Sequence, residues 1–239
     1  MRKIKESLLK LWSWRSCPNK HPSILTNEVM CGGYDEGRDI DCYEFVVFDT
    51  ELTGLDRRRD EIVSIAAIRI TDMRLCFDES FCSLVQTKKK DYGEGTLVHK
   101  ITPQQLLHAP QLEEVLPEFI EFCRDAVLVG HLPELDFSFI DKASRQYLGG
   151  IMHNPCLDSL ELARGYWKLG MKKKLKNLPK INSFNLTELS VACRLPLFAT
   201  HNALGDALQA GCLFLYLIRF LQKLGIKTFR EFHRIGGVR

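Results

Sequence analysis

The hydrophobic pattern of the chain becomes regular at residues 45–48, a continuous Phe-Val-Val-Phe run of strand length. A run that is apolar at every position is typical of a strand covered on both faces. Two further stretches of strand character follow at residues 61–71 and 75–86, and the connection at residues 72–74 is short enough for a tight turn. We therefore predict a three-stranded antiparallel meander.

After the meander the pattern alternates between strand and helix. Residues 126–130 are a short apolar run that predicts another strand. Capping residues mark helix starts: Thr102 is followed by Pro103, and Asp158 and Asn185 each have a glutamate three positions later. Further helices are expected at residues 111–123, 135–147 and 204–221. The domain begins with strands and continues with alternating strands and helices. This order indicates an α/β fold, in which parallel strands join the meander in a mixed sheet flanked by helices.

The first 43 residues differ in pattern from the rest. Residues 1–17 place apolar side chains at helical spacing among lysines and arginines, which predicts a short amphipathic helix. We favour packing of this helix on the folded domain, or on a second copy in a homo-oligomer, over a partner or membrane-surface anchor. Residues 18–43, with Pro, Gly, Asn and Asp and little periodicity, are predicted to be a linker. Residues 44–239 then form one domain with a C-terminal helical extension.

Composition narrows the class of protein without identifying a function. The 239 residues are 45% hydrophobic and 26% charged, which suits a globular protein with a sizeable core. No apolar run is long enough to span a bilayer stably, and no secretory signal is evident. The nine cysteines contain no C-x-x-C pair, so we expect a reducing, cytoplasmic location. A net charge of only +3 means that an acidic polymer would have to be held locally.

Candidate chemistry begins at the end of the first strand, where Asp49 and Glu51 follow the apolar run. Residues two apart on a strand project to the same side, so two like charges are brought together. The pair is either exposed at the strand end or neutralised by a divalent cation, because Mg²⁺ takes carboxylate oxygens as ligands. Alone, this pair is a weak signal.

Three further residues strengthen the metal interpretation. Asp136 follows the predicted strand at residues 126–130, at the end where ligands gather in α/β sheets. It could equally complement a helix N-terminus, a role that Glu134 would share. Asp206 interrupts an apolar helical run, where packing alone would not favour an acid. His201 precedes it by five residues, so we place His201 on the loop entering that helix, facing the same site.

Three blocks of the sequence are similar, in order and approximate spacing, to the three exonuclease motifs of the DnaQ-like (DEDDh) superfamily. They are Asp49-Thr50-Glu51, Gly130-His131-x4-Asp136 and His201-x4-Asp206. The chain therefore resembles this superfamily, and within it the proofreading epsilon subunit of DNA polymerase III, over about residues 44–222. Three ordered blocks are far more specific than any one of them.

The resemblance implies a ribonuclease-H-like sheet and a 3′→5′ exonuclease that releases 5′-mononucleotides from single-stranded 3′ ends. Carried over by position, the ligands of two divalent cations (Mg²⁺ or Mn²⁺) are Asp49, Glu51, Asp136 and Asp206, and the general base is His201. Two ions about 3.5–4 Å apart can stabilise both the attacking and the leaving oxygen. Histidine, with an ordinary pKa of about 6.5, suits base catalysis near neutral pH.

The resemblance also implies substrate contacts, and some of these residues have other interpretations. Thr53, Gly54 and Leu55 resemble the family segment that approaches the terminal nucleotide, although the glycine could equally serve an ordinary turn. His99 resembles a family substrate contact. The lysine-rich segment at residues 172–180 either follows a phosphate backbone or forms a solvated loop.

Two departures from the family pattern affect substrate choice. His131-Leu132-Pro133 stands where His-Asn-Ala is common, and Leu52 stands where threonine is common. Leu132 cannot form the hydrogen bonds of asparagine. We expect activity on DNA ends, by a stand-alone or polymerase-associated enzyme. The alternatives are an RNA-end exonuclease of the oligoribonuclease or ribonuclease T type and a non-catalytic nucleic-acid-binding partner of a polymerase.

Overall fold

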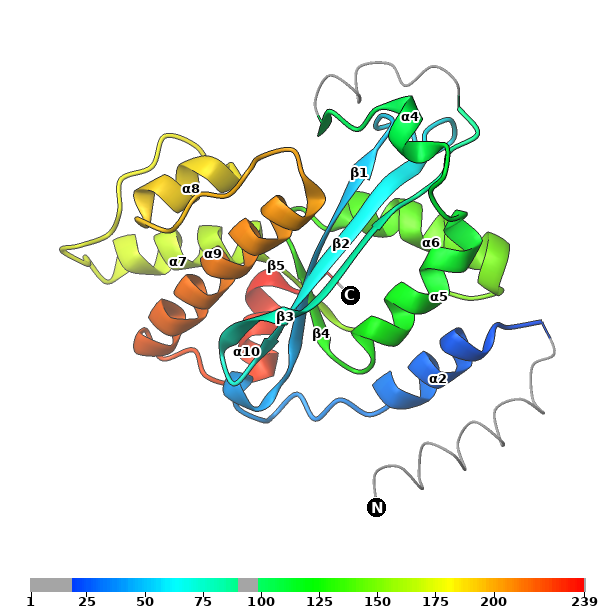
Figure 1. The fold of residues 1–239 in the computed structure, drawn as a ribbon. Coiled ribbons are helices and arrows are strands. Elements are labelled where there is room, and N and C mark those ends of the chain that lie inside the picture. Colours follow the sequence, from blue (N-terminus) through cyan, green and yellow to red (C-terminus); the bar gives the residue numbers. More distant parts are fainter. Residues whose placement is uncertain (1–18, 90–98, 239) are drawn as a thin grey trace.

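The computed structural model describes residues 19–89 and 99–238. A five-stranded sheet in the order β3-β2-β1-β4-β5 forms its centre (Figure 1). The strands are β1 (Phe45–Leu52), β2 (Ile62–Thr71), β3 (Arg74–Leu84), β4 (Val127–Gly130) and β5 (Cys156–Asp158). β1, β2 and β3 pair antiparallel, which confirms the predicted meander, whereas β4 joins β1 and β5 joins β4 in parallel. The sheet is therefore mixed, as predicted.

Helices cover both faces of this sheet (Figure 1). One layer contains α2 (Pro22–Cys31), α5 (Leu112–Cys123) and α6 (Glu134–Leu148). The other contains α7 (Ser159–Lys172), α8 (Leu186–Ala192), α9 (Ala203–Lys223) and α10 (Phe229–Gly236). Two shorter elements are the 3₁₀ helix η1 (Ile40–Cys42) and the single helical turn α4 (Pro103–Leu106). The helices predicted from capping residues begin within two residues of where the sequence places them.

Alternation along β1 sorts its side chains between the two layers. Val46 and Phe48 are buried in the core beneath α2, α5 and α6, whereas Val47 is buried in the core beneath α7 and α9. Because successive strand residues point to opposite faces, Asp49 and Glu51 continue the row of Val47. The buried strand therefore delivers two carboxylates to the face that α9 covers.

α9 brings its first turn to the end of that row. Gly211 permits a close approach to the sheet, since a Cβ there would lie 2.9 Å from Leu75 Cδ2 and 3.4 Å from Val47 Cγ2. The 21 residues of α9 are long and apolar enough to cross a membrane by length and composition alone. Leu213 and Phe214, however, are fully buried in the core against the sheet. Packing within the fold thus accounts for the apolar composition of α9.

The prediction of a linker at residues 18–43 is wrong, because α2 and η1 lie within it. Ile24 on α2 is fully buried against the layer that contains α5. Asn27 is also buried: its Nδ2 donates to Asn154 Oδ1 over 2.6 Å, and its Oδ1 accepts from the His153 N–H over 2.7 Å. A buried asparagine satisfied by distant partners interrupts the hydrophobic period of the helix, so the pattern does not predict it.

The sequence pattern also misses β5, whereas α10 lies in the predicted C-terminal helical extension, whose helix bounds the pattern did not give. β5 has only three residues, too few for a periodic signal. α10 begins with a capping box between Thr228 and Glu231 and packs on α7 and β5. Val238 then donates its N–H to the carbonyl of Cys156 over 3.0 Å, so the C-terminal extension covers the edge of the sheet. The helix predicted at residues 1–17 lies outside the described residues.

Candidate active site

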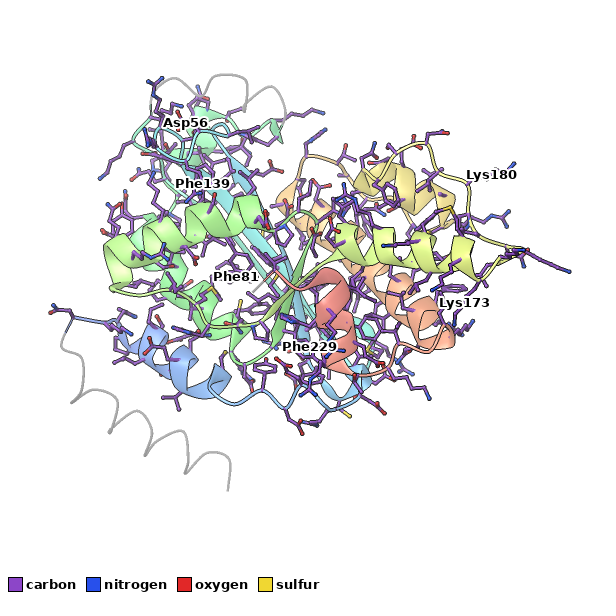
Figure 2. The ribbon with its side chains drawn as sticks, turned by 180° about the vertical axis from the view of Figure 1, so that it is seen from behind. Asp56, Phe81, Phe139, Lys173, Lys180 and Phe229 are labelled. Carbon is purple, nitrogen blue, oxygen red and sulfur yellow. The ribbon has the colours of Figure 1, made fainter. Side chains whose placement is uncertain are left out.

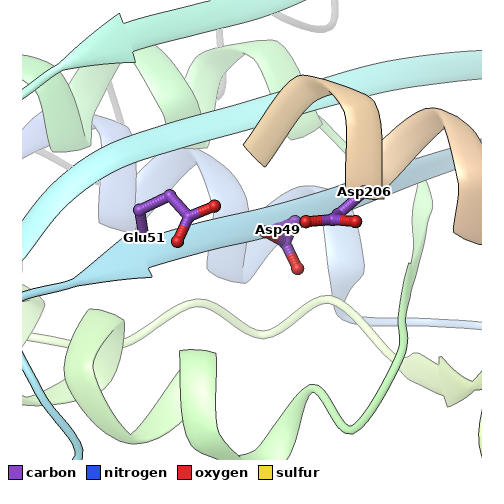
Figure 3. Close-up of side chains that lie close together, drawn as sticks. All are labelled: Asp49, Glu51 and Asp206. Carbon is purple, nitrogen blue, oxygen red and sulfur yellow. The ribbon is translucent and has the colours of Figure 1, made fainter. Parts of the chain in front are cut away.

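Three acidic side chains meet where β1 ends beside the start of α9 (Figure 3). Asp49 and Glu51 come from β1, and Asp206 comes from the first turn of α9. Each offers a carboxylate oxygen, and these oxygens lie within 4.8 Å of one another. Glu51 is only 9% exposed, and Asp49 and Asp206 are half-buried, so the group is partly enclosed by the fold. The structure thus brings together three of the four acids that the resemblance assigns to metal.

Asp136 approaches the same strand from α6. It lies in the first turn of that helix and is 8% exposed. Its Oδ1 accepts hydrogen bonds from the Thr50 backbone N–H, over 3.1 Å, and from the Thr50 hydroxyl. Asp136 is not one of the three acids whose oxygens meet within 4.8 Å, but its charge raises the pKa of both Asp49 and Glu51. Asp136 also lies in the first turn of α6, where its charge complements the helix dipole, and its role as a metal ligand stays a prediction.

Burial and mutual repulsion make the ionised cluster unfavourable. Burial, followed by the charges of the other three acids, raises the pKa of Asp49 well above its ordinary value. Burial and the charges of Asp206 and Asp136 raise the pKa of Glu51 to about 7. Burial also raises the pKa of Asp136 to about 6, although the bonds from Thr50 act to lower it. A nearby cation would relieve this repulsion, so the donor set fits a hard divalent ion.

His201 lies in the loop that enters α9, as predicted, and its side chain is exposed. Its backbone adopts a left-handed φ of 57°, and its N–H donates to Asp206 Oδ2 over 2.9 Å. Burial raises the pKa of Asp206, whereas this bond acts to lower it. The bond fixes the backbone of His201 against one of the three clustered acids and leaves its imidazole accessible.

Two residues that the sequence reasoning missed hold this loop. Asn202 caps α9, because its Oδ1 accepts the Gly205 N–H over 3.1 Å. A Cβ at Gly205 would lie only 2.1 Å from the Ala199 carbonyl oxygen. Only a glycine therefore allows the loop to pass this close to the start of α9. An asparagine before a helix is a capping signal, and it could have been found. The requirement at Gly205 depends on a tertiary contact and gives no signal in the sequence.

The turn from β4 into α6 contains the departure from the family pattern. Leu132 has a φ of 63°, in the left-handed region that favours glycine or asparagine, and its side chain is 55% exposed. Its N–H donates to Asp158 Oδ1 over 3.1 Å. His131 Nδ1 lies 2.9 Å from the Ser159 hydroxyl oxygen, and burial lowers the pKa of His131 to about 4. His131 is therefore a neutral side chain that joins this turn to the start of α7.

The predicted substrate segment after β1 divides into a buried and an exposed part. Thr53 is 2% exposed; its hydroxyl donates to Asp60 Oδ1 over 2.9 Å and accepts from the Glu61 N–H over 3.1 Å. A Cβ at Gly54 would lie 2.5 Å from Asp60 Oδ2, so the glycine makes room for that carboxylate. Leu55, by contrast, is 75% exposed. The Thr53 side chain thus serves the loop, and Leu55 presents its side chain to solvent.

Asp60 organises this loop, a role that the sequence reasoning missed. Besides Thr53, it accepts the Asp56 N–H over 2.8 Å and forms an ion pair with Lys89. Burial acts to raise the pKa of Asp60, but these hydrogen bonds, led by that from Lys89, bring it below its ordinary value. The side chain ties residues 53–60 to the segment after β3. A single acid before a strand does not differ in sequence from a surface charge, so no pattern indicated it.

His99 is buried at 6% exposure, and burial lowers its pKa. Its Nδ1 accepts the Ile101 N–H over 3.0 Å. Among residues 19–89 and 99–238, its Nε2 has no hydrogen-bond partner. The structure therefore gives His99 a local role before α4, and the substrate contact stays a prediction.

Comparison with known proteins places these residues in a family. The family RNase_T, described as exonuclease, matches residues 46–214. The chain is 34% identical over 192 residues to the PolC-type DNA polymerase III of Caldanaerobacter subterraneus subsp. tengcongensis, covering 80% of this chain and 13% of that protein. It is 33% identical over 192 residues to the epsilon subunit of DNA polymerase III of Aquifex aeolicus, covering 80% of this chain and 89% of that subunit. The chain thus spans a small part of the first relative and most of the second.

Solved structures share the fold. E. coli exonuclease I in complex with a dT13 oligonucleotide gives a TM-score of 0.65 at 17% identity, covering 77% of this chain and 42% of that one. Exonuclease X in complex with 5′-overhanging duplex DNA gives 0.56 at 21% identity, covering 80% of this chain and 99% of that one. The predicted ribonuclease-H-like arrangement of a mixed sheet flanked by helices is confirmed.

Proposed function

The chain belongs to the RNase_T exonuclease family, and from that premise we propose that it hydrolyses phosphodiester bonds at nucleic-acid 3′ ends and releases 5′-mononucleotides. One observation carries the proposal: carboxylate oxygens of Asp49, Glu51 and Asp206 meet within 4.8 Å at the end of β1. Enclosing like charges at this cost is typical of a catalytic or metal site. A module that only binds nucleic acid would have no need for this cluster.

The acids fit two divalent cations, Mg²⁺ or Mn²⁺. Asp49, Glu51 and Asp206 are close enough to share one ion. Asp136 is positioned by Thr50 and acts electrostatically on Asp49, so these two acids would hold a second. When bound, such ions would stabilise the negative charge on the attacking and leaving oxygens. Four carboxylates approximately neutralise two divalent ions, which removes the repulsion found in the cluster.

His201 is the proposed general base. Its exposed imidazole is carried by a loop whose backbone is bonded to Asp206. It accepts a proton from the water that attacks the terminal phosphorus, while the bond from phosphorus to the 3′ oxygen of the preceding nucleotide breaks. That oxygen then takes a proton from solvent. His131 is a poor alternative because it bonds to Ser159 and its pKa is only about 4.

Two exposed apolar side chains are close in sequence to the acids and suit the terminal nucleotide. Leu55, 75% exposed, follows β1 four residues after Glu51, and Leu132, 55% exposed, precedes Asp136 by four residues. Apolar contacts with a base or sugar are tolerant of sequence, as an exonuclease that degrades any end requires. We propose that Leu55 contacts the terminal base.

DNA is the proposed substrate, and a DNA polymerase is the proposed partner. Two relatives that support this are DNA polymerase III proteins, and the similar structures of exonuclease I and exonuclease X contain DNA. A PolC-type relative carries the matched region within a much longer chain, which suits a domain that works beside a polymerase.

The test is digestion of matched single strands of DNA and RNA, each labelled at the 5′ end, with Mg²⁺, Mn²⁺ or EDTA. We expect a ladder that shortens from the 3′ end, faster on DNA than on RNA, and abolished by EDTA. Faster digestion of RNA would overturn the substrate assignment. Shortening from the 5′ end, or digestion in EDTA, would overturn the reaction itself.

A further inference from the structure

Positive charge in this chain is concentrated in one segment. Residues 162–187 contain seven lysines and arginines and no aspartate or glutamate. The whole chain carries a net charge of only +3, so removing these seven charges would leave the rest at −4. A weakly charged chain with this asymmetry contains a local basic surface.

The basic residues lie on α7 and in the connection that follows it. Arg164, Lys168 and Lys172 are four residues apart, so they share one face of the helix, and all three are exposed. The connection from α7 to α8 then adds further exposed lysines. Of these, Lys173 directly follows α7, and Lys180 lies farther along the connection (Figure 2). We call this surface the lysine track; its members are Arg164, Lys168, Lys172, Lys174, Lys176 and Lys180.

Most charges of the lysine track are not neutralised within the fold. Arg164 pairs with Glu161. Lys173, which is not a member, donates its ammonium to the carbonyl of Leu224 over 2.7 Å. Among residues 19–89 and 99–238, no ion pair involves Lys172 at the end of α7, or Lys174, Lys176 and Lys180 in the connection after it. These ammonium groups are therefore available to an external anion.

The helix that carries the lysine track begins at the turn that precedes Asp136. α7 begins at Ser159, whose hydroxyl contacts His131, and its cap Asp158 accepts the N–H of Leu132. Both contacts are to the turn that leads into Asp136. A 14-residue helix is about 20 Å long, so the stripe on α7 runs from near this turn to the lysines of the connection.

We propose that the lysine track binds the phosphates of a single strand whose 3′ end lies at Asp49, Glu51 and Asp206. This inference rests on the proposed function, and it adds the path that the nucleic acid takes upstream of its 3′ end. Lysine is a compact point charge that suits phosphates without reading bases, so the contact is independent of sequence. A row of such charges leading from a catalytic centre would hold a long strand between successive cleavages.

The test is the salt dependence of binding to a 5′-labelled oligothymidylate of about twenty nucleotides, which exceeds the span of one small binding domain. Binding is measured in EDTA, so hydrolysis does not interfere. The variant carries Lys172→Gln, Lys174→Gln and Lys176→Gln, and Lys173 is kept because of its contact with Leu224. The matched control carries Arg74→Gln, Arg124→Gln and Lys227→Gln. It loses the same charge from the end of the sheet opposite to the acids, where β1 and β4 begin.

Each phosphate contact on a single strand contributes about 0.7 to the slope of log affinity against log salt, so the track variant should lose about 2. The control should retain the slope of the original protein. Equal slopes in both variants would overturn the lysine track. So would equally strong displacement of the strand by a polyglutamate peptide of similar charge, because it would indicate an acidic protein partner. A loss of slope without hydrolysis in Mg²⁺ would instead contradict the proposed function and leave the binding surface supported.

Discussion

The backbone N–H of Thr50 donates a hydrogen bond to Oδ1 of Asp136 over 3.1 Å, and the Thr50 hydroxyl donates a second one to the same oxygen. This contact joins the first turn of α6 to the strand that carries Asp49 and Glu51. It also acts against the effect of burial on the pKa of Asp136. Thr50 therefore lies between two of the acids in β1 and positions the third, Asp136.

Replacing Thr50 by valine removes the hydroxyl but keeps the branched shape and the backbone N–H. The pKa of Asp136 should rise, because a bond to its ionised form is lost. We expect kcat/KM to fall about tenfold, and its acid limb to move to higher pH. Thr50→Ser keeps a hydroxyl and is the control. A valine variant with the original pH profile would show that the hydroxyl has no part in positioning the acid.

Without a divalent cation, the fold should lose stability as pH rises. The folded pKa of Glu51, about 7, lies above its ordinary value of 4.5. Such a group contributes stability that is complete below the unfolded pKa and is lost as the pH rises through the folded pKa. In EDTA, the free energy of unfolding should therefore decline between pH 4.5 and about 7. The contribution of this group is about 3 kcal/mol.

Urea unfolding at several pH values in EDTA measures this decline. Glu51→Gln cannot ionise and should flatten the profile, and saturating Mg²⁺ should restore stability at neutral pH. Identical profiles for the two proteins would mean that Glu51 is not under the repulsion inferred from its surroundings.

His201→Asn removes the base and suits the left-handed backbone at this position, which alanine would strain. We expect kcat to fall by about 10²–10⁴-fold, the usual contribution of a general base, while Mn²⁺ still binds. His108→Asn, in an exposed loop, is the control. Loss of Mn²⁺ binding in His201→Asn would make His201 a ligand or a structural residue instead.

Gly54→Ala should destabilise the protein by about 1–3 kcal/mol, because the new Cβ meets the Asp60 carboxylate. In an Asp60→Ala background that obstacle is gone, so the same substitution should cost much less. A double-mutant cycle by urea unfolding measures the coupling between the two positions. Strictly additive effects would show that the glycine is needed for another reason.

Much of the site could be predicted because the strand period alone fixes its centre. Asp49 and Glu51 follow a buried run two positions apart, and that spacing puts both on the face that α9 covers. Asp206 and His201 could be assigned to the site only from the order of the three sequence blocks. The pattern of a helix and its entry loop does not indicate which strand they face. The mixed sheet followed from strands and helices whose periodicity is strong.

What the sequence could not give depends on contacts between distant residues. Thr53 looked like a substrate contact, yet its hydroxyl bonds to Asp60, which no local pattern distinguishes from a surface acid. The pattern predicts a linker where α2 lies, because this helix buries Asn27, a polar side chain that bonds to the distant residues Arg124, His153 and Asn154. Asp136 lies at the start of a helix and is also a neighbour of the acid cluster, so its sequence position alone does not separate the two interpretations.

We propose that hydrolysis depends on a divalent cation bound by Asp49, Glu51 and Asp206. The direct measurement is Mn²⁺ binding by calorimetry, in parallel with digestion of a 5′-labelled single strand, for the original protein, Asp206→Asn and Asp78→Asn. Asp78 is an exposed acid on β3 and serves as the control. The account predicts that Asp206→Asn stays folded but loses both Mn²⁺ affinity and hydrolysis by at least about 100-fold, whereas Asp78→Asn loses neither. A folded Asp206→Asn variant that binds Mn²⁺ and digests the strand at the original rate would contradict it.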